Sequence, residues 1–284
     1  MEISKTITDT EIKKIFPNIE MKKKYLEELY KNKKIYKQSA KTNKEINQRI
    51  VETWDYEISK KIIRELFKET DKYKNSKESN KLLKEALKEW KENKLGDIKW
   101  PFQALGFDNY IQQINCRNIT EEEKDILVKE DIVKYRRIKK INTYRNDFIE
   151  YLIVENNSNI IPTLKHSRGV DFYINGYPYD QKVSKSVTKQ FKDNYGEIWR
   201  DIAIKKPEIV AEYLYKYQDD QRFGYEPRLL VVNIDENIDN EDIIKCVKKV
   251  DFQKTIKLKF KYTHPNNIVK EYTTECYIIL LYKH

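Results

Sequence analysis

Apolar side chains recur at helical spacing through the first half of the chain. Within residues 43–72, every fourth position is apolar: Ile46, Ile50, Trp54, Ile58, Ile62 and Leu66. This spacing places the side chains on one face of a helix, where such a stripe usually packs into a core. Further helical patterns occupy residues 20–37, 80–93 and 120–135, with a polar break expected at residues 75–79. We therefore predict a helical region over residues 1–140, for DNA contact, dimerisation or both.

Two shorter stretches of this region have their own signals. Thr120 and Glu123 have the spacing of a capping box, which predicts a helix beginning there. Residues 99–107 are aromatic, nearly uncharged and interrupted by Pro101 and Gly106. We interpret them as a packed connector to the rest of the chain, with a DNA-contacting loop as the alternative.

The second half mixes strand and helix patterns. Strands are expected over residues 160–164, 228–234 (a continuous apolar run, RLLVVNI), 255–262 and 270–282, the last two joined by a turn at 264–267. Helices are expected over residues 146–154, 187–200, 207–221 and 240–250. This order predicts an α/β (α+β) fold in which a mixed central β-sheet is flanked by helices, with residues 141–284 as the core. Close packing of the helical region onto this core, as one body, is the alternative to two domains.

A β-hairpin is predicted between residues 168 and 186. The dipeptide Asn175-Gly176 tolerates the positive φ angles of a tight turn and lies between two runs of strand formers. Asp171 stands near the start of the outgoing strand and Asp180 towards the end of the returning one, so the turn should bring them close. Because side chains alternate along a strand, Asp180 and Lys182 should share one face and Gln181 should point to the other.

Two carboxylates and a lysine at one end of a hairpin suit phosphodiester hydrolysis. Mg²⁺ prefers oxygen ligands and commonly takes one or two carboxylates. A lysine beside the ion could position a water or stabilise negative charge that develops on phosphate. The alternative is a surface hairpin with solvated charges, since Asp and Lys are frequent in this chain.

The string formed by Asp171, an eight-residue gap and Asp180-Gln181-Lys182 resembles the PD-(D/E)xK nuclease signature, the fold of many type II restriction endonucleases. Val170 stands where the family has proline. The family core also has a helix before the hairpin that often carries a glutamate, and residues 144–155 with Glu150 fit that helix. The resemblance covers residues 142–235, about a third of the chain.

The resemblance implies an endonuclease that cuts double-stranded DNA and depends on Mg²⁺, with Mn²⁺ as a substitute. By analogy, the metal ligands are Asp171, Asp180, Gln181 through its carbonyl, and Glu150, and Lys182 acts on the attacking water. A homodimer is favoured because cutting both strands needs two active sites or two binding events. Two alternatives stay open: a repair or defence nuclease for structured or damaged DNA or RNA, and a non-catalytic nucleic-acid-binding protein.

The chain carries a net charge of +10, which suits a polyanionic partner. The alternative source of this charge is a Lys-rich composition from an AT-rich prokaryotic genome. The side chains expected to contact DNA phosphates are Arg136, Arg137, Lys139, Lys140, Arg168, Ser184, Lys185 and Lys189. For most charge runs the alternative is a solvated helix face, and for His166 a structural role is favoured over a phosphate contact.

The three cysteines are far apart and form no CxxC pair, so neither a zinc site nor a disulfide framework is indicated. We expect Cys116, Cys246 and Cys276 to be buried small apolar residues in a reducing cytoplasm. The sequence has no stretch that resembles a signal peptide or a membrane span. A soluble cytoplasmic protein is therefore expected.

Overall fold

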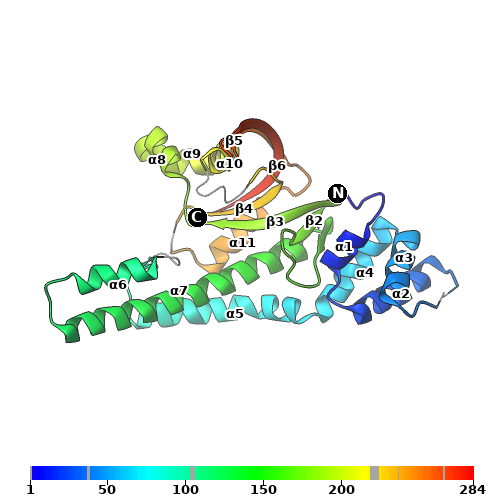
Figure 1. The fold of residues 1–284 in the computed structure, drawn as a ribbon, viewed down its shortest axis with the longest axis horizontal. Coiled ribbons are helices and arrows are strands. Elements are labelled where there is room, and N and C mark those ends of the chain that lie inside the picture. Colours follow the sequence, from blue (N-terminus) through cyan, green and yellow to red (C-terminus); the bar gives the residue numbers. More distant parts are fainter. Residues whose placement is uncertain (1, 37–38, 103–105, 218–223, 236, 265) are drawn as a thin grey trace.

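A mixed β-sheet lies at the centre of the computed structural model, which describes residues 2–36, 39–102, 106–217, 224–235, 237–264 and 266–284 (Figure 1). Its strands are β1 (Ile160–Pro162), β2 (Phe172–Ile174), β3 (Tyr177–Ser184), β4 (Arg228–Asn233), β5 (Ile256–Thr263) and β6 (Val269–Leu281). Their order in the sheet is β1-β2-β3-β4-β6-β5. The pairs β3–β4 and β4–β6 are parallel and the other pairs are antiparallel. The expected fold class is confirmed.

Helices surround the sheet and extend away from it. The N-terminal helices are α1 (Asp9–Ile15), α2 (Ile19–Lys33), α3 (Asn43–Thr53), α4 (Tyr56–Glu69), α5 (Asp71–Glu92) and α6 (Phe107–Asn115). They are followed by α7 (Glu121–Asn156), α8 (Lys189–Tyr195), the 3₁₀ turn η1 (Gly196–Ile198), α9 (Trp199–Lys205), α10 (Pro207–Lys216) and α11 (Asn240–Lys248). Helices α7 and α11 cover one face of the sheet, and α8, α9 and α10 cover the other (Figure 1).

The alternation of side chains along the central strands assigns each to one of these faces. Leu229 and Val231 of β4 belong to the buried cluster that includes α7 and α11. Leu230 and Val232 belong to the cluster that includes α8 and α10. Because paired residues on neighbouring strands share a face, this division also fixes the faces of the β3 side chains.

The single helix expected over residues 43–72 is wrong. The chain turns at Asp55, whose side chain accepts a hydrogen bond from the Ile58 N–H and caps α4. A second turn follows at Thr70, whose hydroxyl caps α5 by accepting from Tyr73 N–H. Capping side chains satisfy backbone donors that a helix start leaves open. The apolar stripe therefore continues from α3 into α4 although the helix itself is interrupted between them.

The polar break expected at residues 75–79 is also wrong, because α5 runs through it. Ser76 and Ser79 are buried, and α5 lies along α7 (Figure 1). The Ser79 hydroxyl donates to the Asn75 carbonyl, 2.9 Å away, so its polar group is satisfied within the helix. The polar sequence of residues 75–79 therefore resembles a loop, but its serines are small residues that pack where two helices meet.

Helix α7 joins two segments that the sequence pattern separates. Its capping box between Thr120 and Glu123 is confirmed, and the helix continues for 36 residues. The boundary expected near residue 140 lies inside this helix. One buried cluster contains Ile46 of α3, Ile141 of α7 and Leu229 of β4, so the N-terminal helices and the sheet share a core.

The C-terminal strands agree with their expected ranges, as does β4. The end of the helix expected at residue 221 and residue 265 of the expected turn lie outside the described residues, as do residues 103–105 of the connector. Across the described parts of the chain, no helix has the length and apolar character needed to cross a bilayer. Cys246 and Cys276 are buried as expected, but the same expectation is wrong for Cys116, which is exposed just after the end of α6.

Candidate functional site

The predicted hairpin is confirmed and brings the signature residues together. Ile174 pairs with Tyr177 around a turn in which Asn175 and Gly176 have φ angles of 51° and 85°. Both angles lie in the left-handed region, which tight hairpin turns require. At the other end of the hairpin, the Asp171 N–H donates to the Tyr179 carbonyl, 2.9 Å away. Asp171 is thereby fixed beside the strand that carries Asp180.

Asp180 and Lys182 share one face of β3, as predicted, and they touch. Lys182 Nζ lies 2.6 Å from Asp180 Oδ2. Arg228, the partner of Asp180 in the parallel register with β4, places Nη1 2.9 Å from the same oxygen. Both Asp180 and Arg228 are buried on the face covered by α8, α9 and α10. The carboxylate of Asp180 is therefore neutralised by two cations from its own sheet.

Gln181 points to the opposite face, where it is paired with Leu229. Its side-chain carbonyl Oε1 is buried and has no hydrogen-bond partner among the described residues. Its backbone N–H donates to Asp171 Oδ2 at 2.7 Å. This bond orients the Asp171 carboxylate across the hairpin, towards the β3 backbone.

Glu150 of α7 lies near Asp171 and forms an ion pair with a lysine. Lys72 of α5 lies 2.5 Å from Glu150 Oε1, and both side chains are buried. Asp147 lies one turn earlier on α7, and burial raises its pKa, with a further rise from the charge of Glu150. His166 and Lys72 oppose that rise. A group of acidic and basic side chains thus gathers on the α7 face.

Asp171 lies within electrostatic reach of both groups. Burial raises the pKa of its carboxyl to about 6, and the charges of Glu150 and Asp180 add to the rise. The Gln181 N–H and the Lys72 ammonium act in the opposite direction. Glu150 and Asp180 each have a cationic partner, whereas Asp171 forms no ion pair among the described residues. Of the three carboxylates of the signature, Asp171 is therefore the one left to bind a cation.

Whether a metal ion fits at Asp171 depends on the cations that already pair with Glu150 and Asp180. Within the described ranges, no three His, Cys, Asp or Glu side chains are grouped closely enough to hold an ion. The Asp171 carboxylate is nevertheless an oxygen donor, as is Gln181 Oε1, which has no hydrogen-bond partner among the described residues, and oxygen donors suit a hard divalent cation. Glu150 or Asp180 would join Asp171 by exchanging its lysine or arginine partner for the ion.

The basic side chains at residues 136–140 of α7 differ in their exposure and in their contacts. Arg136, Lys139 and Lys140 are exposed. Arg137 pairs with Glu89 at 3.6 Å, and Lys140 Nζ lies 5.8 Å from the centre of the Tyr144 ring.

The other side chains expected to contact DNA lie around the hairpin. Arg168, Lys185 and Lys189 are exposed, whereas the Ser184 hydroxyl donates to the Ser186 carbonyl at 2.7 Å. Lys185 Nζ lies 4.9 Å from the centre of the Trp100 ring.

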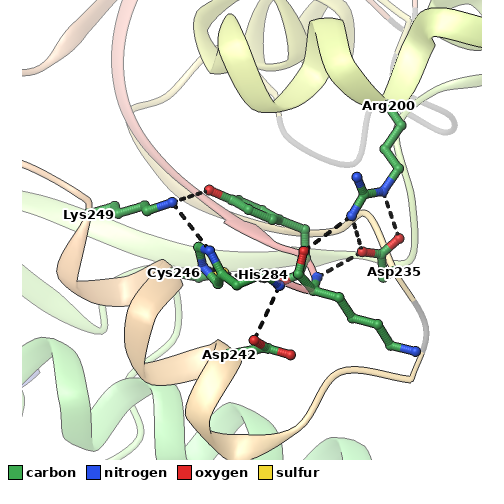
Figure 2. Close-up of polar contacts among 8 residues, drawn as sticks. Arg200, Asp235, Asp242, Cys246, Lys249 and His284 are labelled. Atoms are coloured by element: carbon green, nitrogen blue, oxygen red, sulfur yellow. Dashed lines mark hydrogen bonds and ion pairs between the residues drawn. The ribbon is translucent and has the colours of Figure 1, made fainter.

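A second group of polar side chains surrounds Cys246 and His284 (Figure 2). Cys246 Sγ lies 3.7 Å from His284 Nε2. The backbone N–H of His284 donates to Asp242 Oδ1 at 3.3 Å. Burial raises the pKa of the Cys246 thiol, which disfavours the thiolate that a nucleophile needs. Arg200 and Asp235 form a two-point ion pair beside this group. We interpret the group as an anchor for residues 283–284.

The sequence interpretation missed Lys72, Asp147 and Arg228. Arg228 had a signal, because a lone charge beginning a continuous apolar strand is seldom buried unless it is paired. Lys72 falls at helical spacing with the buried Ser76, Ser79 and Leu83. That spacing would have placed it on the inner face of α5 had the polar break not been assumed.

Comparison of the chain with known protein families, curated proteins and solved structures gives no match.

Proposed function

We propose that the chain is a metal-dependent endonuclease acting on double-stranded DNA, of the type II restriction kind. The observation that carries the proposal is the position of Asp171, half-buried and under the electrostatic influence of Glu150 of α7 and Asp180 of β3, with no ion pair of its own among the described residues. The order of elements α7, β1, β2, β3, then helices and the parallel strand β4, supports it. These are the elements that the resemblance to PD-(D/E)xK nucleases requires.

The side chains have separate roles in this proposal. Asp171, oriented by the Gln181 N–H, is the principal ligand for Mg²⁺, and Glu150 or Asp180 completes the carboxylate set. The bound ion would polarise the phosphate and lower the pKa of a water. Lys182, released from Asp180, would hold that water or the phosphate oxygen. The basic side chains on α7 and beyond β3 would bind the DNA backbone without reading bases.

Incubation of supercoiled plasmid with the protein and Mg²⁺ tests the proposal. We expect linear or discretely cut DNA, and we expect Asp171→Asn to abolish cutting while DNA binding in EDTA persists. Asp193→Asn, which changes an exposed carboxylate on α8, is the matched control and should cut normally. Full cutting by Asp171→Asn would remove the proposal. Structure-dependent nicks in place of discrete fragments would favour a repair or defence nuclease instead.

A homodimer belongs to this proposal, because one active site cuts one strand. Sedimentation of the protein with and without a DNA duplex tests it. Double-strand cuts by a protein that stays monomeric on DNA would contradict it.

A non-catalytic DNA-binding protein is the second candidate. It is favoured by the neutralisation of Asp180, whose carboxylate already bonds Lys182 and Arg228. Binding to DNA that persists with every divalent metal, with no hydrolysis under any of them, would select it.

A further inference from the structure

Arg145 of α7 is a buried cation with no anionic partner among the described residues. Its side chain is 5% exposed, and its Nε and Nη2 atoms have no hydrogen-bond partner among the described residues. Within the described part of the chain, its guanidinium donates one side-chain hydrogen bond, from Nη1 to Asn233 Oδ1 at 3.4 Å. Burial alone lowers the pKa of Arg145 to about 10. A guanidinium in such surroundings is normally paired with a carboxylate or phosphate.

Arg145 lines a hollow of about 730 Å³ between α7, the residues around Trp100 and the carboxyl ends of β3 and β4. Lys99, Lys139 and Lys185 also line it, and no carboxylate does so among the described lining residues. Trp100, Pro101 and Phe102 also belong to its lining. The hollow therefore joins several positive charges to an aromatic wall, and its volume is that of pockets for small organic ligands.

The hollow adjoins the candidate active site. Val183 in its wall follows Gln181 by two residues and lies on the same face of β3. Arg145 precedes Glu150 by five residues on α7, which is about 7.5 Å along a helix axis. In open α/β sheets, the crevice outside the carboxyl ends of parallel strands is the usual ligand site.

We propose that this hollow binds a nucleotide unit, with the phosphate on Arg145 and the base or sugar against Trp100 and Phe102. Arg145 is suited to this role because its planar fork donates two parallel bonds to phosphate oxygens. Lys139 at the exposed edge attracts the anion. The ligand can be a free nucleotide or one nucleotide of a strand. In the second case the inference rests on the proposed function, since the strand would continue to Asp171.

Binding is measured by calorimetry in EDTA, on protein carrying Asp171→Asn so that no probe is cut. The probes are inorganic phosphate, thymidine monophosphate and a short oligothymidylate without terminal phosphates. We expect at least one nucleotide probe to bind, and Arg145→Met to weaken it by about tenfold or more. The unliganded Arg145→Met protein should melt at the same temperature or higher, because the substitution removes an unpaired buried charge.

A second pair of variants keeps the test sharp if Arg145→Met does not fold. Lys139→Glu reverses a charge that lines the hollow, and Lys23→Glu reverses an exposed lysine of α2 that does not. Lys139→Glu should weaken binding by about tenfold and Lys23→Glu much less. Equal effects of the two, unchanged binding by Arg145→Met, or no binding of either nucleotide probe would overturn the inference.

The probes also distinguish the two sources of the ligand. Binding of the oligothymidylate identifies a strand, and binding of the monophosphate alone identifies a free nucleotide. If the wild-type protein never cuts DNA while the binding of a nucleotide probe still depends on Arg145, the proposed nuclease function is wrong and the nucleotide site is supported.

Discussion

Asp180 of β3 and Arg228 of β4 form a buried ion pair, with Oδ2 of the aspartate 2.9 Å from Nη1 of the arginine. The two residues are partners in the parallel register, so the pair joins the strands where β4 begins. Lys182 contacts the same carboxylate oxygen. The signature motif is therefore tied into the sheet by ion pairs as well as placed for any chemistry.

Arg228→Met should destabilise the protein by about 2–3 kcal/mol, because it leaves Asp180 buried with Lys182 as its remaining cation. Urea unfolding followed by circular dichroism measures the change. The double variant Arg228→Met with Asp180→Asn should regain much of the loss, since it removes the unpaired charge. A single variant as stable as wild type would show that the pair contributes nothing net.

Lys72→Met should cost about 3 kcal/mol, since it leaves Glu150 buried without its cation. The pair joins α5 to α7, so the loss should appear in the one cooperative transition expected of a shared core. A double-mutant cycle with Glu150→Gln measures the coupling between the two side chains. Additive effects of the two substitutions would contradict a direct interaction.

Gly176→Ala should destabilise the hairpin for two reasons. Gly176 has φ +85°, and a Cβ atom there would lie 2.9 Å from Ser4 Cβ and 3.0 Å from Ser4 N. Gly169→Ala is a matched control, because Gly169 has φ +80° but no atom within 4 Å of a Cβ. We expect about 1 kcal/mol for Gly169→Ala from strain and clearly more for Gly176→Ala. Equal losses in thermal unfolding would mean that residues near Ser4 move aside freely.

These relationships show which features a sequence can reveal. The Asn175-Gly176 turn, the capping box at Thr120 and the apolar strand β4 depend on neighbouring residues, and each was predicted. The same-face placement of Asp180 and Lys182 follows from strand alternation alone.

What the sequence did not reveal depends on residues far apart in the chain. The cations that neutralise Glu150 and Asp180 come from α5 and β4, and no local spacing connects them to the signature. Helix α5 continues through its serines because α7 lies beside it. The signature therefore predicts which carboxylates gather, but tertiary packing decides which of them is already neutralised.

Asp171 should make stability depend on pH. Its pKa lies at about 6 in the folded protein, above the ordinary 3.8, so the folded state holds the proton more tightly than the unfolded state. Stability therefore falls as pH rises from about 4 to about 6, by about 3 kcal/mol from this group. The unfolding free energy of Asp171→Asn relative to wild type should rise over that interval and be level on either side of it. A difference that stays constant with pH would contradict the raised pKa.

Divalent cations should stabilise the protein through Asp171 if the proposed function is right. At pH 7 the Asp171 carboxylate is ionised, and an ion that binds the folded state alone stabilises it by about 1.4 kcal/mol at ten times its dissociation constant. The melting temperature of the wild-type protein should rise with Mg²⁺ or Mn²⁺ at fixed ionic strength, and that of Asp171→Asn should not.

Two further variants show which face of β3 supplies the second ligand for that ion. Glu150→Gln removes the carboxylate on the α7 face, and Asp180→Asn removes the one beside Arg228. Loss of the metal-induced rise in only one of them identifies the partner of Asp171, because the other carboxylate remains with its own cation. An equal rise in wild type, Asp171→Asn and both further variants would mean that the ion binds elsewhere, and the hairpin would then be an element of the sheet without a metal site.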